Sequence, residues 1–288
     1  MSDRLVRSDW LPFGTSPDAA VRLLCVPHAG AGATVYRAWA SGLARWIGVC
    51  PVQPPGREKR RHEQPLDAVG PLVELLARDV AALISPPYAV FGHSTGALCA
   101  FELIRELRRI GAPEPVHLFV AGRRAPQLPM QRTHLSDLSI EDLALALRRL
   151  GGTPEEVLAD HDLLRMIQPM LIADFSVNEA YVYTPEATLA TPITAFAATS
   201  DAGADLDQVA AWKDQTSAGF RLHALAGGHF AVFDRASEVL AVIAATLGDW
   251  SLCPMRRSST ESSTIAVTTV GRNLCGGLDA GSRHWFKP

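Results

Sequence analysis

Residues 92–96 read G-H-S-T-G and fit the pattern G-x-S-x-G, in which a serine can act as a nucleophile. The pattern is short, so its meaning depends on its neighbours. A strand-like apolar run, 88–91, precedes it, and a helix-like segment, 97–110, follows it. This order predicts a nucleophile elbow, a strained turn that exposes the Ser94 hydroxyl near a helix N-terminus. The alternative is a glycine-rich turn with an incidental serine.

A serine hydroxyl is a weak nucleophile at neutral pH and needs a base. In the elbow-type hydrolases the chain order is nucleophile, acid, histidine. His229 fits best, because residues 227–230, G-G-H-F, follow the last strand-like run and precede a final helix-like segment. The other histidines lie before Ser94, inside strand-like runs, in a helical insertion or in the tail: His28, His62, His93, His117, His134, His161, His223 and His284.

The acid of such a triad should follow the strand-like run 193–198, where three aspartates stand. Asp201 comes soonest after the run, so its carboxylate can still reach the imidazole, and position favours it over Asp205. Asp207 is expected to cap a helix over 208–216. The acid would orient the imidazole and stabilise its protonated form.

An oxyanion hole needs two backbone N–H donors. One is expected from Thr95, the residue after the nucleophile, and the other from the loop after an early strand. Residues 27–32, P-H-A-G-A-G, follow the run 22–26, and their small side chains allow a close approach to substrate. We choose the Ala29 N–H as the second donor. His28 is a catalytic candidate, although a loop-orienting role fits its position better.

Short apolar runs alternate with helical patterns along the chain, which predicts an α/β fold, a mostly parallel sheet with helices on both faces. A helical insertion over about 131–177 breaks this rhythm and predicts a lid, the alternative being ordinary crossover helices. Ser139 and Asp142 fit a capping box there, with Asp in place of Glu. The expected strands are 22–26, 48–52, 88–91, 116–121, 193–198 and 221–225, and the expected helices include 69–83, 97–110, 140–150 and 154–164.

Composition sets the remaining limits. The chain has 288 residues, of which 48% are hydrophobic, enough for one large domain over 1–250. A net charge of −3 argues against a nucleic-acid partner. No apolar run is long enough to cross a bilayer. The polar N-terminus does not resemble a signal peptide. Five irregularly spaced cysteines are typical of a protein in the reducing cytoplasm. The Ser/Thr/Gly/Arg-rich tail, 251–288, is expected to be disordered. No metal-ligand cluster or nucleotide-binding loop is found, so no cofactor is expected.

Five segments resemble the type II thioesterases that accompany polyketide and nonribosomal peptide synthases. They lie in order at 24–30 (L-C-V-P-H-A-G), 36–39 (Y-R-A-W), 52–58 (V-Q-P-P-G-R-E), 91–94 (F-G-H-S) and 227–230 (G-G-H-F). The resemblance runs from about residue 22 to 250. In that family the acid lies eleven residues before a tryptophan, and Trp212 then points to Asp201. The family usually has methionine where Thr95 stands, which is expected to alter the pocket but not the backbone donor.

The resemblance implies an α/β-hydrolase that cleaves acyl thioesters from the phosphopantetheine arm of acyl-carrier or peptidyl-carrier proteins and so removes stalled or wrongly primed chains. A free-standing carboxylesterase or lipase acting on small oxygen esters remains the alternative, because the triad serves both reactions. A non-catalytic binding protein is a third reading, against which the ordered serine, acid and histidine argue. Some basic residues after strand ends are expected to dock the acidic carrier: Arg57, Lys59, Arg60, Arg61, Arg123 and Arg124. Arg57 is the expected exception, because its place in the proline-glycine-arginine segment fits an internal structural contact.

Overall fold

The computed structural model describes residues 7–14, 19–129 and 138–251. The predicted tail beyond 251, the first residues of the predicted insertion, His134 and His284 lie outside them. All six predicted strands are present and form one sheet in the order β2-β1-β3-β4-β5-β6, with every neighbouring pair parallel. The strands are β1 Val21–Val26, β2 Ile47–Pro51, β3 Tyr88–His93, β4 His117–Ala121, β5 Ile193–Ala198 and β6 Phe220–Leu225.

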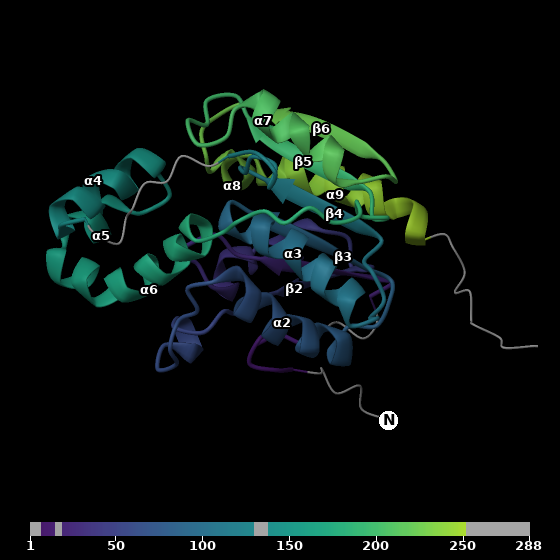
Figure 1. Ribbon diagram of the computed structural model, residues 1–288, viewed down its shortest axis with the longest axis horizontal. Coiled ribbons are helices and arrows are strands. Elements are labelled where there is room, and N and C mark those ends of the chain that lie inside the picture. Colours follow the sequence, from purple (N-terminus) through teal and green to yellow (C-terminus); the bar gives the residue numbers. More distant parts are fainter. Residues whose placement is uncertain (1–6, 15–18, 130–137, 252–288) are drawn as a thin grey trace, which may run out of the picture. The chain divides into compact units, whose positions relative to one another are not determined.

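Helices cover both faces of the sheet, because its central strands are apolar on both sides. In β1, Leu24 packs in one apolar cluster with the long helices α2 and α3, whereas Leu23 packs on the other face with α1 and α9. Figure 1 shows α2 and α3 side by side. The helices concerned are α1 Trp39–Gly42, α2 Val69–Leu83, α3 Thr95–Arg109 and α9 Ala236–Ser251.

Short helical segments complete the connections after the strands. Three are 3₁₀ turns and two are short α-helices. They are η1 Ala33–Tyr36, η2 Glu58–Arg60, α7 Leu206–Ala210, η4 Ala211–Gln215 and α8 Ala231–Asp234. The predicted helix over 208–216 is therefore wrong in its bounds, since α7 begins at Leu206 and gives way to η4 after Ala210.

Between β4 and β5 the described residues form helices and no strand. These helices are α4 Ile140–Leu150, α5 Glu155–Ala159 and α6 His161–Glu179, and they share an apolar cluster of their own (Figure 1). Ser139 caps α4 by accepting from the Asp142 N–H, as predicted, while the Asp142 carboxylate accepts from the Ser139 hydroxyl. The predicted segment 154–164 is divided at Asp160, whose side chain caps α6.

Parallel strands place their carboxyl ends at one edge of the sheet. The order β2-β1-β3 reverses the direction of winding between β1 and β3, and ligands of open α/β sheets bind outside such a switch point. The loop that holds Ala29 follows β1, and Ser94 follows β3. The predicted site residues after β1, β3, β5 and β6 therefore share one edge of the sheet.

Candidate active site

Ser94 occupies a strained turn between β3 and α3. Its φ of +55° lies in the left-handed region that residues with a Cβ rarely adopt. Close packing leaves no room for a Cβ at either glycine of the pattern. A Cβ at Gly92 would lie 2.2 Å from the Gly96 carbonyl oxygen, and a Cβ at Gly96 would lie 2.2 Å from the carbonyl oxygen of Val26. The elbow thus packs directly on the end of β1, and the predicted strand–turn–helix order is confirmed.

Asp201 and His229 meet beyond the ends of β5 and β6. The Asp201 carboxylate accepts a hydrogen bond from His229, with 2.8 Å between Oδ2 and Nδ1. Its other oxygen accepts from the Gly203 N–H at 2.8 Å, and the carboxylate is buried. Both oxygens are therefore fixed, and the imidazole keeps Nε2 for chemistry.

Asp205, the rival acid, has a structural role. Its side chain accepts from the Gln208 N–H, and the Gln208 side chain accepts from the Asp205 N–H, so the two form a capping box at the start of α7. The prediction that Asp207 caps this helix is wrong by two residues. Asp207 lies in the first turn of α7, where a carboxylate suits the helix dipole.

Two further histidines lie close to His229. His93 Nε2 lies 2.9 Å from the His229 carbonyl oxygen, to which it donates. Burial, and then the charge of His229, hold the pKa of His93 well below its ordinary value. The same two causes lower the pKa of His28 to about 4, which makes it a poor base at neutral pH. His28 packs edge-on against His93 and Phe230, in agreement with the predicted loop-orienting role.

The loop after β1 and the first turn of α3 carry the two predicted oxyanion donors. Within the described residues, neither the Ala29 N–H nor the Thr95 N–H donates to a protein acceptor. Both residues line the same cavity as Ser94. These two N–H groups are therefore available to a substrate oxygen.

The segment after β2 supports this loop. The Gln53 side chain accepts from the Ala33 N–H at 3.0 Å, and Glu58 accepts from both the N–H and the hydroxyl of Thr34. A Cβ at Gly32 would lie 2.4 Å from Glu58 Oε1. The family-like residues 52–58 thus brace the segment that follows the loop carrying Ala29, the predicted oxyanion donor.

Two of the predicted carrier-docking arginines are turned inward. Arg57 is 6% exposed and forms a bidentate ion pair with Asp174 of α6, at 2.5 and 2.8 Å. Arg123 donates to the Asn178 side chain and lines the cavity, and burial lowers its pKa to about 10. Arg57 cannot dock a carrier from this position, and it makes the internal contact that was expected to set it apart from the other basic residues.

The other four basic residues lie nearer the surface, and two of them have partners within the protein. Arg60 pairs with Glu63 at 2.6 Å and lies over the Trp10 ring, and Arg124 donates to the Pro129 and Gly203 carbonyls. Lys59 and Arg61 are exposed. These two retain the freedom that a docking role requires.

A cavity of about 600 Å³ opens above Ser94, within the usual size of small-molecule sites. His28, Thr95, Arg123 and His229 line its base. Its upper wall comes from α4–α6 and is mostly apolar: Leu147, Leu150, Val157, Ile167, Met170, Leu171 and Phe175. The cavity therefore joins a polar reaction centre to a wall that suits an acyl chain.

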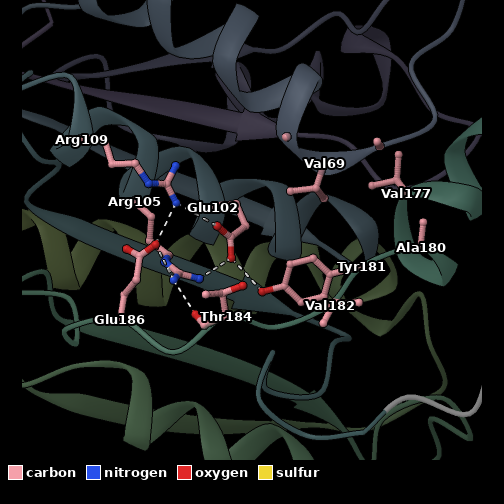
Figure 2. A pocket seen from close by; sticks show the side chains of 12 residues that line it. Val69, Glu102, Arg105, Arg109, Val177, Ala180, Tyr181, Val182, Thr184 and Glu186 are labelled. Carbon is pink, nitrogen blue, oxygen red and sulfur yellow. Dashed lines mark hydrogen bonds and ion pairs between the residues drawn. The ribbon is translucent and has the colours of Figure 1, made fainter.

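A second cavity, of about 520 Å³, lies beside α3 and the start of α2. Figure 2 shows its ion pairs, in which Arg105 bridges Glu102 and Glu186. The Tyr181 hydroxyl donates to Glu102, and Arg109 also pairs with Glu186. These contacts tie the segment after α6 to α3, and the charges balance one another.

The described residues also bear on metal binding and membrane spans. In the part of the chain that the structure describes, no group of three or more His, Cys, Asp or Glu side chains could hold a metal ion. No helix within those residues has the length and apolar character needed to cross a membrane.

The fold and the site define the α/β-hydrolase class, and comparison with known proteins narrows it. Residues 21–247 match the family described as "Thioesterase domain". The chain belongs to this family and is an enzyme that hydrolyses thioesters.

Several relatives come from biosynthetic pathways. The gramicidin S biosynthesis protein GrsT of Aneurinibacillus migulanus is 40% identical over 222 residues, which cover 77% of this chain and 87% of GrsT. Thioesterase PikA5 of Streptomyces venezuelae is 39% identical, covering 83% of this chain and 86% of PikA5. The solved structure of the RedJ thioesterase, from the prodiginine pathway of Streptomyces coelicolor, superposes with a TM-score of 0.75 at 37% identity over 79% of this chain and 85% of RedJ.

Three residues at this site were not predicted from the sequence. Asp174 and Asn178 of α6 contact the loop after β1 and the first turn of α3, and Arg149 of α4 lines the cavity while staying exposed. The helical patterns contained all three, but nothing in those patterns points toward Gly30 and Thr95, which lie 144 and 83 residues from Asp174 and Asn178. The resemblance offered one signal, since a buried Arg57 in a family segment demands a buried acidic partner.

Proposed function

We propose that this thioesterase hydrolyses acyl thioesters from the phosphopantetheine arm of acyl-carrier or peptidyl-carrier proteins, and so removes stalled or aberrant chains from a polyketide or nonribosomal peptide synthase. The observation that carries the proposal is that Ser94, His229, Ala29 and Thr95 line one cavity, with the Ala29 and Thr95 N–H groups donating to no acceptor among the described residues. The biosynthetic pathways of the relatives support the choice of substrate.

In the proposed first half-reaction, Ser94 Oγ attacks the thioester carbonyl carbon while His229 Nε2 takes the hydroxyl proton. Asp201 stabilises the imidazolium that results. The carbonyl oxygen becomes an oxyanion held by the Ala29 and Thr95 N–H groups. Collapse of this intermediate breaks the carbon–sulfur bond, and His229 gives its proton to the leaving pantetheine thiolate.

In the second half-reaction, water replaces the thiol. His229 removes a proton from the water, which attacks the acyl-Ser94 ester through a second oxyanion. The acid product leaves, and the proton returns to Ser94 Oγ. The chain needs no cofactor of its own for these steps, because the phosphopantetheine belongs to the carrier.

We assign α4–α6 the role of a lid over the acyl group. Their apolar side chains form the upper wall of the cavity, and an acyl chain buried there gains roughly 0.8 kcal/mol per methylene. Arg124 and Arg149 line the same cavity and suit the phosphate of the arm. Cys25 and Cys99 are buried and form no disulfide among the described residues, which is compatible with a reducing cytoplasm, where the partner synthases would be met.

Hydrolysis of a panel of carrier proteins tests the proposal. The panel carries acetyl, propionyl and longer acyl groups, and each is paired with an oxygen ester of the same acid. The proposal expects kcat/KM to be higher for the carrier thioesters. A preference for the free oxygen esters would favour a carboxylesterase instead, and failure of Ser94 to react with a fluorophosphonate probe would exclude both.

A further inference from the structure

Helix α6 contacts both backbone segments that we assign to the oxyanion hole. The Asp174 carboxylate accepts from the Gly30 N–H, with 2.6 Å between Oδ2 and the nitrogen. One turn later, the Asn178 amide donates to Thr95 Oγ1 at 2.6 Å. Residues four apart share one face of a helix, so a single face of α6 reaches the loop after β1 and the start of α3.

The Asp174 carboxylate is itself held in place. Arg57 binds both of its oxygens, and the same guanidinium donates to the carbonyls of Pro55 and Ala31. All of this is buried, with Arg57 and Asp174 each 6% exposed. A buried ion pair adds little net stability compared with apolar side chains of similar volume, so stability alone does not account for it.

The approach of α6 to the loop is close. Gly30 has φ +80°, and a Cβ there would lie 2.9 Å from the Leu171 side chain of α6. The Gly30 N–H belongs to the peptide plane that joins it to Ala29. Because that plane is rigid, fixing this N–H restrains ψ of Ala29 and with it the direction of the Ala29 N–H.

We infer that Asp174 and Asn178 are positioning residues for the oxyanion hole, Asp174 acting on the Ala29 N–H and Asn178 on the Thr95 N–H. Neither touches the reacting atoms. The inference rests on the proposed assignment of Ala29 and Thr95 as donors. It also gives α6 two roles, since Met170 and Phe175 of the same helix line the acyl cavity.

Two double variants test the role of Asp174. Arg57→Met/Asp174→Leu removes both charges and the acceptor for the Gly30 N–H, whereas Arg57→Met/Asp174→Asn removes the charges and keeps an acceptor oxygen. Neither leaves a buried charge unpaired, which guards the fold. We expect kcat of the Leu variant to fall about 10- to 100-fold, less than the roughly 100- to 1,000-fold loss from removing an oxyanion donor outright, because the Ala29 N–H is misdirected and not removed. The kcat of the Asn variant should be at least ten-fold higher than that of the Leu variant. The KM of both variants should stay within about two-fold of the wild-type value.

A second readout separates positioning from general damage. A trifluoromethyl ketone analogue forms a tetrahedral adduct with the nucleophile and places its oxyanion in the hole. Its inhibition constant should rise in step with the fall in kcat/KM for the Leu variant and recover in the Asn variant. Equal kcat in two folded double variants, or a loss confined to KM, would overturn the role of Asp174.

The Asn178 contact is tested by a double-mutant cycle with Thr95. Asn178→Leu and Thr95→Val each break the same hydrogen bond, so their effects on kcat should overlap rather than multiply. Fully independent effects, or no loss of kcat in either, would overturn this part. Each variant is also assayed on p-nitrophenyl acetate. If the wild type cleaves this ester but no thioester, the proposed substrate is wrong. The kcat values of the variants on the ester then still test the positioning of the oxyanion hole, independently of the substrate.

Discussion

The Asp201 carboxylate holds the His229 imidazole through Nδ1, across 2.8 Å, and leaves Nε2 as the ring nitrogen able to take a proton. Replacing Asp201 with Asn should therefore impair turnover by several orders of magnitude, because an amide donor favours the wrong imidazole tautomer. The measurement is kcat on an N-acetylcysteamine thioester. An asparagine side chain has the same shape as aspartate and can still accept from the Gly203 N–H, so the thermal midpoint should change little.

Asp205→Ala is the matched control for this prediction. It removes the capping box of α7 and should lower the free energy of unfolding by about 1 kcal/mol, the usual effect of losing an N-cap. Its kcat should stay close to the wild-type value. A variant at Asp205 that loses more activity than Asp201→Asn would move the acid to Asp205.

Ser94 offers a test in which activity and stability move in opposite directions. Its φ of +55° is unfavourable for any residue with a Cβ and easy for glycine. Both Ser94→Ala and Ser94→Gly should lose all measurable turnover and all fluorophosphonate labelling. The Gly variant should have the higher thermal midpoint, because roughly 1 kcal/mol of backbone strain is released in its folded state. Equal midpoints for the two variants would mean that the turn is not strained.

The strands were predictable because buried parallel strands are continuous apolar runs. The run at 193–198 is buried at every position, and its predicted bounds match β5. The length of α6 was harder to foresee, since Pro169 normally ends a helix yet here lies inside one. The cap of α7 was misplaced because Asp205 and Asp207 have similar cap propensity, and only the Gln208 contact separates them.

The site was predictable where chemistry imposes a local pattern. Ser94 stands between glycines that a tight turn requires, and His229 stands in a loop after a strand. The contacts of α6 had no such pattern. Asp174 meets the Gly30 N–H across 144 residues of chain, and an aspartate on a helix is ordinarily a solvated charge. Only the packing of α6 on the loop gives Asp174 and Asn178 their partners.

The buried histidines make stability depend on pH. Burial, and then the charge of Arg221, lower the pKa of His117 to about 4 from an ordinary 6.5. Between these values the unfolded chain binds a proton that the folded protein refuses, so stability is lost as pH falls from 6.5 toward 4. His117 should contribute a loss of roughly 2 kcal/mol on going from pH 8 to pH 5.

His117→Gln checks this contribution. The glutamine amide can still reach the Thr194 hydroxyl, which His117 Nε2 contacts at 2.8 Å. Urea unfolding at pH 8 and pH 5 gives the change in free energy for each protein. The variant should lose less stability than the wild type over this interval. An identical loss would show that His117 does not titrate as its burial implies.

The last prediction concerns the carrier. Lys59 and Arg61 are exposed and directly follow the segment 52–58, and Arg149 is exposed and lines the cavity. Carrier proteins are typically acidic, and the thioester end of their phosphopantetheine arm must reach Ser94 from outside, while the phosphate stays at the carrier end. Exposed pairs contribute about 0–1 kcal/mol each and are screened by salt, so a joint effect is needed to see them. Replacing all three with Ala should raise KM for carrier-bound substrate several-fold at low salt and much less at high salt.

A free thioester and a matched triple variant give the controls. Hydrolysis of an N-acetylcysteamine thioester should barely change in the Lys59, Arg61 and Arg149 triple variant, because this substrate makes no carrier contact. The control replaces three exposed arginines with Ala, namely Arg45, Arg78 and Arg221, of which Arg45 precedes β2 and Arg221 lies at the amino end of β6. It makes the same change in net charge away from the cavity edge of the sheet. Equal rises in KM for the two triple variants would indicate a general effect of charge. Equal losses of kcat/KM on carrier-bound and free substrate would mean that Lys59, Arg61 and Arg149 support the active site itself.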